Sequence, residues 1–197
     1  MPWSDALAAG AAGILDGVDQ RVLLVGWSLG GQLALAAALQ RPEVVAGLVL
    51  LATTPRFVAA EGFPGCAPAA LRAMQLGVRR DAERVRTDFW QRLALPHDAT
   101  TAGAWQQAYT DAADAATLAA GLDSLATTDL RAELGTLDVP TVCLHGAEDA
   151  IIPSAAGRAL AAAMPRARFV ELTGGHAVPL EHPQTVKTAI DTLRHDR

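Results

Sequence analysis

Cysteine and long apolar runs are both scarce in this sequence, and each scarcity excludes a class of protein. Only Cys66 and Cys143 occur among 197 residues. One lies in an expected loop and the other in an expected strand, so they form neither a disulfide framework nor a metal site. No apolar stretch is long enough to cross a membrane without polar interruption, and the first five residues contain no basic leader. We therefore expect a cytoplasmic protein with no metal and no membrane partner.

Charged residues are also few, and positive charge is not in excess. Charged side chains make up 19% of the sequence and the formal net charge is −5, which argues against a general nucleic-acid-binding surface. Hydrophobic residues reach 51%, so the chain can bury a substantial core and disorder is not expected. These values fit one compact domain.

What the sequence does contain is an alternation of short apolar runs with Ala/Leu-rich helical patterns. This alternation predicts an α/β fold with a mostly parallel sheet, in which the active site lies at the carboxyl ends of the strands. Strands are expected over about 21–25, 44–51, 139–145 and 167–172, and helices over about 5–17, 31–40, 154–164 and 182–193.

The alternation is interrupted in the middle of the chain. From Pro55 to about Leu130 the strand-like runs vanish, and helical periodicity follows in two or more segments. We interpret residues 55–130 as a helical cap. It is inserted into a core that residues 1–54 and 131–197 form.

The most informative motif is Gly26-Trp27-Ser28-Leu29-Gly30, which stands between an apolar run and a helical run. Its glycines permit a sharp turn that presents the Ser28 hydroxyl at the carboxyl end of a strand. There the serine can attack a carbonyl carbon, and the N–H of Leu29 points at the oxyanion that forms. A serine between glycines is by itself more often a turn residue, so the prediction depends on partners elsewhere.

Those partners follow in the chain order Ser, Asp, His. Asp149 comes soon after one expected strand, and His176 follows Gly174-Gly175 after the next. In this arrangement His176 takes the proton of Ser28, while Asp149 orients the imidazole and stabilises its charged form.

Several neighbours compete for these roles. Glu148 is an alternative carboxylate, and His145 and His182 are alternative bases. His182 stands at the start of an expected helix, where a capping or packing role is common. His97 and His195 lie in a loop and in the final turn, and no other chemistry-bearing residues accompany them.

With these motifs the chain resembles the α/β-hydrolases, and more narrowly the pimeloyl-acyl carrier protein methyl ester carboxylesterases of biotin synthesis. The serine elbow and the Asp and His positions are shared by the whole superfamily. The narrower resemblance extends from about residue 22 to the C-terminus. It rests on Gly26-Trp27-Ser28-Leu29-Gly30-Gly31, Arg41-Pro42-Glu43, Thr53-Thr54-Pro55-Arg56-Phe57, Gly62-Phe63-Pro64-Gly65, Thr128-Asp129-Leu130-Arg131 and Gly175-His176-Ala177.

The resemblance implies a serine esterase that removes the methyl group from a pimeloyl chain carried on acyl carrier protein, with no cofactor. It implies a triad of Ser28, Asp149 and His176, with the Leu29 N–H as one oxyanion donor.

The resemblance also implies residues that bind the substrate. Trp27 and Phe57 match positions that line the acyl pocket in the family, and Phe89 matches a cap aromatic. The same three aromatics are equally consistent with core packing.

A further implication is that cap arginines contact the acidic carrier protein. Arg84 matches a carrier-binding position and Arg80 lies near it, whereas Asp88 stands where the family has another arginine. Between residues 72 and 92 there are six arginines and three acidic residues, a local net charge of +3. A solvated helix of mixed charge has the same composition, and positive charge here would mainly accelerate encounter with an acidic partner.

The chain departs from the family before the elbow. Only about twenty residues precede the first expected strand, and no His-Gly motif among them supplies the second oxyanion N–H. We therefore expect an N-terminally truncated α/β-hydrolase fold with its first strand at a sheet edge. The loss of one oxyanion donor costs roughly two to three decades in rate. A longer natural protein, or a divergent short form that pairs with another chain or has lost activity, would account for this start.

Three hypotheses remain at this point. The first is a monomeric carboxylesterase of biotin synthesis that acts on a small acyl ester on its carrier. The second is a general small-ester esterase or lactonase of the same superfamily. The third is a non-catalytic truncated hydrolase that acts as a binding module, which an active-site serine probe would distinguish from the other two.

Overall fold

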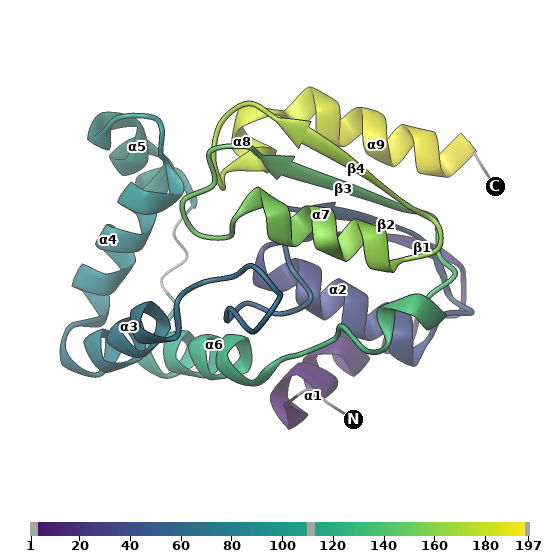
Figure 1. Cartoon of the computed structure of the whole chain (residues 1–197), viewed down its shortest axis with the longest axis horizontal. Helices are drawn as coiled ribbons and strands as arrows, with labels where there is room; N and C mark the ends of the chain where they lie inside the picture. The colour runs from purple at the N-terminus through teal and green to yellow at the C-terminus, as the bar shows by residue number, and fades with distance from the viewer. Residues whose placement is uncertain (1–3, 110–112, 196–197) are drawn as a thin grey trace.

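A computed structural model of the chain describes residues 4–109 and 113–195, so three of the first five residues, in which no basic leader was expected, lie outside the described residues. Its four strands form one parallel sheet in the order β1-β2-β3-β4 (Figure 1). They are β1 (Val22–Trp27), β2 (Val45–Leu51), β3 (Thr141–Gly146) and β4 (Ala167–Leu172). The expected alternation of strands and helices in the core is therefore confirmed.

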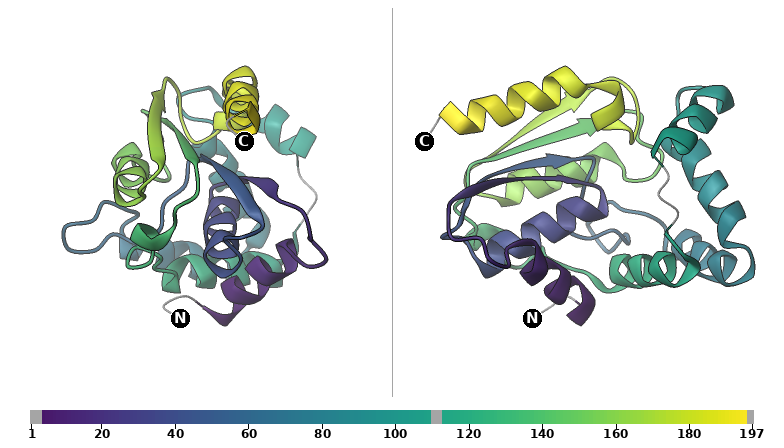
Figure 2. Two further views of the ribbon diagram at one scale, coloured as in Figure 1. Left: turned by 90° about the vertical axis from the view of Figure 1, so that its right-hand side faces the viewer. Right: turned by 180° about the vertical axis from the view of Figure 1, so that it is seen from behind.

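Both faces of the sheet are covered by helices. Successive residues of a strand point to opposite faces, so alternate residues of one strand meet different helices. On β2, Leu48 and Leu50 pack into a cluster with α1 (Asp5–Ile14), α2 (Leu29–Gln40) and α7 (Ser154–Ala163). Val49 and Leu51 pack on the other face against α9 (Pro183–His195), and Figure 2 shows this helix apart from the other three. The uninterrupted apolar run of β2 is thus explained by burial on both sides.

The first strand has a different environment from β2. β1 lies at one edge of the four-stranded sheet, as expected, and pairs only with β2 among the described strands. Its Val25 is 46% exposed, whereas every residue of β2 is buried.

The stretch between β2 and β3 forms four α-helices, a short 3-10 helix and no strand within its described residues; two isolated bridges occur near its start. An apolar cluster between α-helices of this stretch includes Phe57, Leu71, Val78, Leu122 and Ile152. The helices lie beyond the carboxyl ends of the strands (Figures 1 and 2). They are α3 (Pro68–Arg80), α4 (Ala82–Leu93), α5 (Ala99–Tyr109) and α6 (Ala115–Thr127).

An ionic cluster joins the two ends of this helical segment. Arg56, near its start, donates to the Asp129 carboxylate at 2.7 Å. Arg131 donates to both oxygens of the same carboxylate at 2.8 Å. Three charged side chains thereby hold together the points where the chain leaves and re-enters the sheet.

Two short elements were not expected from the sequence, η1 (Leu134–Thr136) and α8 (Val178–Glu181). Each spans only three or four residues, which is too short for helical periodicity to register. No helix in the described part of the chain is long and apolar enough to cross a membrane.

Candidate active site

Ser28 occupies a sharp turn between β1 and α2. Its φ of 54° and ψ of −121° are unusual for a residue that carries a side chain, and such strained backbone persists only where neighbours hold it in place. The Ser28 N–H donates to the Leu51 carbonyl at 2.9 Å, and the Thr53 hydroxyl donates to the Ser28 carbonyl at 2.6 Å. The end of β2 thus supports the turn from both sides of the serine.

Two glycines of the elbow, Gly26 and Gly31, are required by space. A Cβ at Gly26 would lie 2.5 Å from the Gly30 carbonyl oxygen, and one at Gly31 would lie 2.6 Å from the Thr53 side chain. Leu29 is the first residue of α2, so its N–H has no acceptor within the helix. It remains the candidate oxyanion donor.

Asp149 lies in the loop after β3, and its side chain is completely buried. One carboxylate oxygen accepts the N–H groups of Ile151 and Ile152 at 2.8 and 2.9 Å. The other lies 2.7 Å from His176 Nδ1 and 3.1 Å from His145 Nε2. Burial alone would raise the pKa of Asp149, but these hydrogen bonds outweigh it and hold the pKa below its ordinary value. The carboxylate is therefore ionised at neutral pH.

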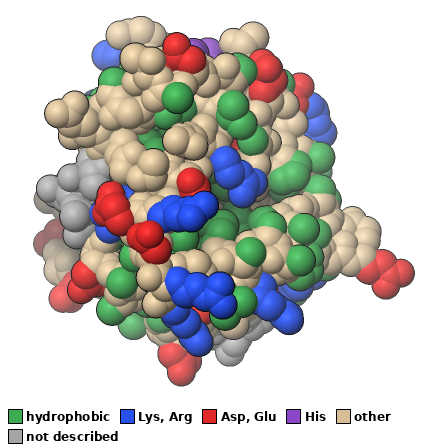
Figure 3. Space-filling model, turned by 90° about the vertical axis from the view of Figure 1, so that its left-hand side faces the viewer, with side chains coloured by type: hydrophobic (Ala, Val, Ile, Leu, Met, Phe, Trp, Pro, Cys, Tyr) green, Lys and Arg blue, Asp and Glu red, His purple; other side chains and the backbone are tan. Residues whose placement is uncertain are grey.

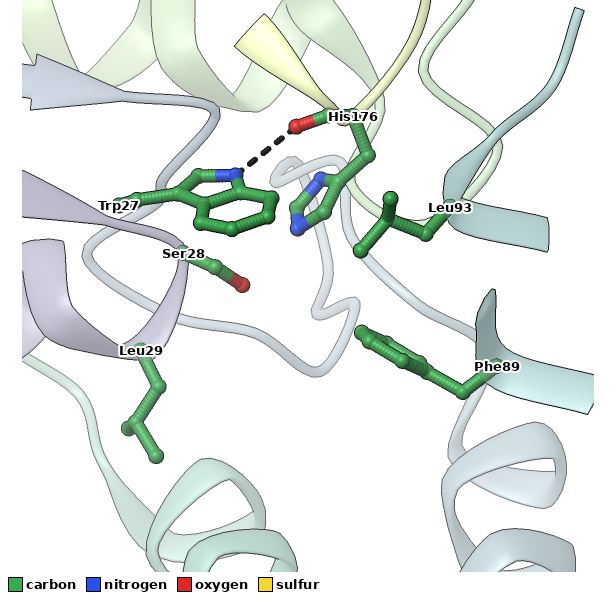
Figure 4. A pocket seen from close by; sticks show the side chains of 6 residues that line it. All are labelled: Trp27, Ser28, Leu29, Phe89, Leu93 and His176. Carbon is green, nitrogen blue, oxygen red and sulfur yellow. Dashed lines mark hydrogen bonds between the residues drawn. The ribbon is translucent and has the colours of Figure 1, made fainter. Parts of the chain in front are cut away.

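His176 is the histidine that meets this carboxylate and the serine cavity together. Its Nδ1 contacts Asp149, while its Nε2 is buried and has no hydrogen-bond partner among the described residues. The Trp27 indole N–H donates to the His176 carbonyl at 2.8 Å. Figure 4 shows the imidazole and the Ser28 hydroxyl bordering the same cavity, where they are not hydrogen-bonded to each other. Serine and base often become aligned only when substrate is bound.

The competing residues have other surroundings. Glu148 is exposed, and His182 Nε2 contacts the Thr173 carbonyl at 2.7 Å. His195 contacts a backbone carbonyl within its own helix. His145 does not border the cavity, and instead adds a second imidazole contact to the Asp149 carboxylate.

The cavity over Ser28 has a volume of about 160 Å³. Its lining is mainly apolar and consists of Trp27, Ser28, Leu29, Phe89, Leu93 and His176. Trp27 and Phe89, two of the expected pocket residues, are both present. Leu93 was not expected, although it follows Phe89 by four residues on α4 and so shares its helix face.

Phe57, the third aromatic expected in the pocket, is not among the lining residues. It is 4% exposed and packs with Leu71 and Val78 in the apolar cluster of the helical segment. Its position soon after β2 turns it toward α3 instead of toward Ser28, so the packing interpretation fits its surroundings.

The expected carrier-binding arginines are exposed on the helical segment. Arg84 is on α4, where its Nε lies 3.9 Å from the Asp88 carboxylate, and Arg80 ends α3. Figure 3 shows Lys and Arg side chains on this side of the molecule, interspersed with acidic and apolar ones. Asp88 therefore reduces the positive charge around Arg84.

Comparison with known proteins gives a consistent result. The family model described as the alpha/beta hydrolase fold matches residues 17–183. The chain belongs to the α/β-hydrolase family. A pimeloyl-[acyl-carrier protein] methyl ester esterase of Nitrosomonas europaea is 36% identical over 186 residues, which cover 91% of this chain and 74% of the relative.

Solved α/β-hydrolase structures resemble this one in fold. An esterase from Exiguobacterium antarcticum has a TM-score of 0.84 at 22% identity and covers 95% of this chain and 72% of its own. The enol-lactonase from Burkholderia xenovorans has a TM-score of 0.82 at 22% identity. The match covers 98% of this chain and 74% of the lactonase. In this α/β-hydrolase, the described residues contain no group of three or more His, Cys, Asp or Glu that could hold a metal ion.

Proposed function

We propose that this α/β-hydrolase is a serine carboxylesterase in which Ser28 is the nucleophile, His176 the base and Asp149 the residue that orients it. One observation carries the proposal. His176 has one nitrogen bonded to a buried carboxylate and the other unpartnered, and that imidazole borders the same cavity as the Ser28 hydroxyl. A buried nitrogen without a partner is costly in a protein interior, and here it is placed to accept a proton.

The reaction follows from this arrangement. Ser28 Oγ forms a bond to the ester carbonyl carbon as its proton passes to His176 Nε2, and the Leu29 N–H stabilises the oxyanion. Collapse of the intermediate breaks the bond to the alcohol oxygen, which leaves with the proton from His176. Water then attacks the acyl-enzyme through the same base, and the carboxylic acid and free Ser28 result. Ionised Asp149 stabilises the imidazolium throughout.

We propose a pimeloyl chain on acyl carrier protein, as its methyl ester, as the substrate. The pimeloyl-[acyl-carrier protein] methyl ester esterase of Nitrosomonas europaea, at 36% identity, carries this activity in its name. The apolar cavity suits a hydrocarbon chain with a small leaving group, which would depart as methanol. Exposed Arg80 and Arg84 on the helical segment offer positive charge to an acidic carrier.

A second candidate is a carrier-independent esterase or lactonase. It is favoured by the contact between Arg84 and Asp88, since a carboxylate beside the expected carrier site weakens attraction to an acidic protein. The non-catalytic binding module is the third, and it requires that Ser28 be unreactive.

Two measurements test these alternatives. Fluorophosphonate labelling of the chain and of Ser28→Ala shows whether the serine is nucleophilic; we expect labelling of the first only. No labelling of the wild-type chain would favour the binding module.

The kcat/KM for pimeloyl-acyl carrier protein methyl ester is then compared with that for dimethyl pimelate. We expect a preference for the carrier-bound ester that Arg84→Glu reduces, and equal values would favour the carrier-independent enzyme.

A further inference from the structure

We propose that Glu181 and His97 are positioning residues for His176, so that the junction between α4 and α5 holds the base in place. This inference rests on the proposed function of His176. His97 lies in a loop between α4 and α5, as expected, but the expectation that no chemistry-bearing residue accompanies it is wrong. It contacts a buried carboxylate beside the proposed base.

The first step is the contact between Glu181 and the turn that carries His176. The Glu181 side chain is 6% exposed, and its Oε2 accepts the Gly175 N–H at 3.1 Å. Gly174 has a φ of 88°, and a Cβ there would lie 2.6 Å from the same carboxylate oxygen. The carboxylate therefore fills the space inside the turn and fixes the Gly174–Gly175 peptide, one residue before His176.

The second step is the contact from the helical segment to Glu181. His97 Nε2 lies 2.9 Å from Glu181 Oε1, and since a carboxylate only accepts, this nitrogen carries the proton. The backbone N–H of His97 donates to the Ala94 carbonyl at 2.7 Å. Its ring meets Trp105 of α5 edge-on, at 5.4 Å between centroids and an angle of 74°. Backbone and ring contacts together set the direction in which His97 donates.

The third step is that the same junction touches both loops of the proposed triad. A Cβ at Gly175 would collide with the Leu95 carbonyl oxygen, so the junction lies directly against the turn before His176. Arg92 donates to the Ala150 carbonyl at 3.1 Å, next to Asp149. Leu93, between these contacts, borders the cavity with His176.

These contacts predict a specific defect when His97 is lost. Glu181 would keep the Gly175 N–H but lose its side-chain donor, and the turn before His176 would become less ordered. A base that is misplaced part of the time slows the chemical step more than it weakens binding of a small ester. The structure thus predicts a fall in kcat with little change in KM.

The test compares His97→Ala, His97→Gln and His195→Ala in hydrolysis of p-nitrophenyl butyrate. We expect His97→Ala to lower kcat about tenfold, the value of one hydrogen bond to a charged group that is partly exposed, with KM changed less than about twofold. Glutamine can donate from a similar position, so His97→Gln should restore most of the rate. His195→Ala, an exposed histidine on α9, should behave as wild type.

A second readout does not depend on activity. Hydrogen exchange of the Gly175 amide should accelerate in His97→Ala and return toward wild type in His97→Gln. Wild-type kcat together with unchanged exchange in His97→Ala would overturn the positioning role, and so would a loss of kcat that His97→Gln does not relieve. If the wild-type chain is inactive but His97→Ala still accelerates exchange at Gly175, the proposed function fails and the structural link stands.

Discussion

Nε2 of His145 lies 3.1 Å from Oδ2 of Asp149, the carboxylate oxygen that also receives His176 Nδ1. The same His145 nitrogen lies 2.9 Å from the Ile152 carbonyl oxygen. Both neighbours are acceptors, so this nitrogen carries a proton, and the two acceptors share that proton. The Asp149 carboxylate is thus held by two imidazoles at one oxygen and by two backbone N–H groups at the other.

This relationship predicts the effect of replacing His145. His145→Phe removes a buried hydrogen bond to a charged group, worth about 1.5–3 kcal/mol, and should lower kcat about 10- to 100-fold by freeing the Asp149 carboxylate. His145→Gln keeps a donor and should lose less. Steady-state kinetics on p-nitrophenyl butyrate, with circular dichroism to verify folding, measures both. Equal activity of the phenylalanine variant and wild type would show that the contact is not needed.

Trp27 also supports His176, because its indole N–H donates a hydrogen bond to the His176 carbonyl. Trp27→Phe keeps an aromatic wall but removes this donor, so we expect kcat to fall about 3- to 10-fold, as for a typical hydrogen bond. Trp90→Phe, on α4 and outside the cavity lining, is the matched control. If both variants lose activity to the same extent, the hydrogen bond is not the cause.

Two adjacent glycines of the elbow should respond differently to alanine. A Cβ at Gly31 would press on Thr53, which supports the Ser28 carbonyl, whereas a Cβ at Gly30 meets nothing within 4 Å. Gly31→Ala should cost about 1–3 kcal/mol of unfolding free energy through overpacking, and should also reduce labelling of Ser28. Gly30→Ala should be neutral or slightly stabilising, because alanine favours helix. Urea unfolding of the pair measures the difference, and equal destabilisation would contradict it.

Asp129 predicts a pH dependence of stability. The Arg131 hydrogen bonds and the Arg56 contact lower the pKa of Asp129 from 3.8 to about 2. A carboxyl whose pKa is lower in the folded state stabilises the fold above its unfolded value, and this contribution is lost as pH falls from about 4 to about 2. Wild type should therefore lose more stability than Asp129→Asn over that interval. Asp16→Asn, at an exposed position, serves as the control.

The measurement for Asp129 is urea unfolding at several pH values between 2 and 7. Parallel pH curves for wild type and Asp129→Asn would show that the carboxylate does not contribute. A flatter curve for Asp16→Asn than for wild type would mean that the effect is not specific to the ionic cluster.

The core of the fold could be predicted from the sequence because it depends on local patterns. The apolar run that became β2 is buried on both faces, and the elbow motif places glycine where Gly26 and Gly31 have no room for a Cβ. The parallel sheet also followed from the alternation of strands and helices along the chain. The ends of the observed helices and strands differ from the predicted ends by a few residues. The short α8 was missed because four residues are too few to show a helical period.

The assignment of individual side chains in the site depended on contacts between distant parts of the chain. Spacing left Glu148 and Asp149 as alternatives, and burial in the fold separates them, with only Asp149 against His176. Phe57 was expected in the cavity and packs elsewhere. His97 meets Glu181 across 84 positions of sequence, a separation at which residue spacing carries no information. The sequence by itself determined the strands, the elbow and the order of the candidate triad, because these follow from local backbone and hydrophobic periodicity. The tertiary structure alone decided which imidazoles and carboxylates meet, because that depends on which loops lie side by side at the ends of the strands and on how the helical segment packs over them.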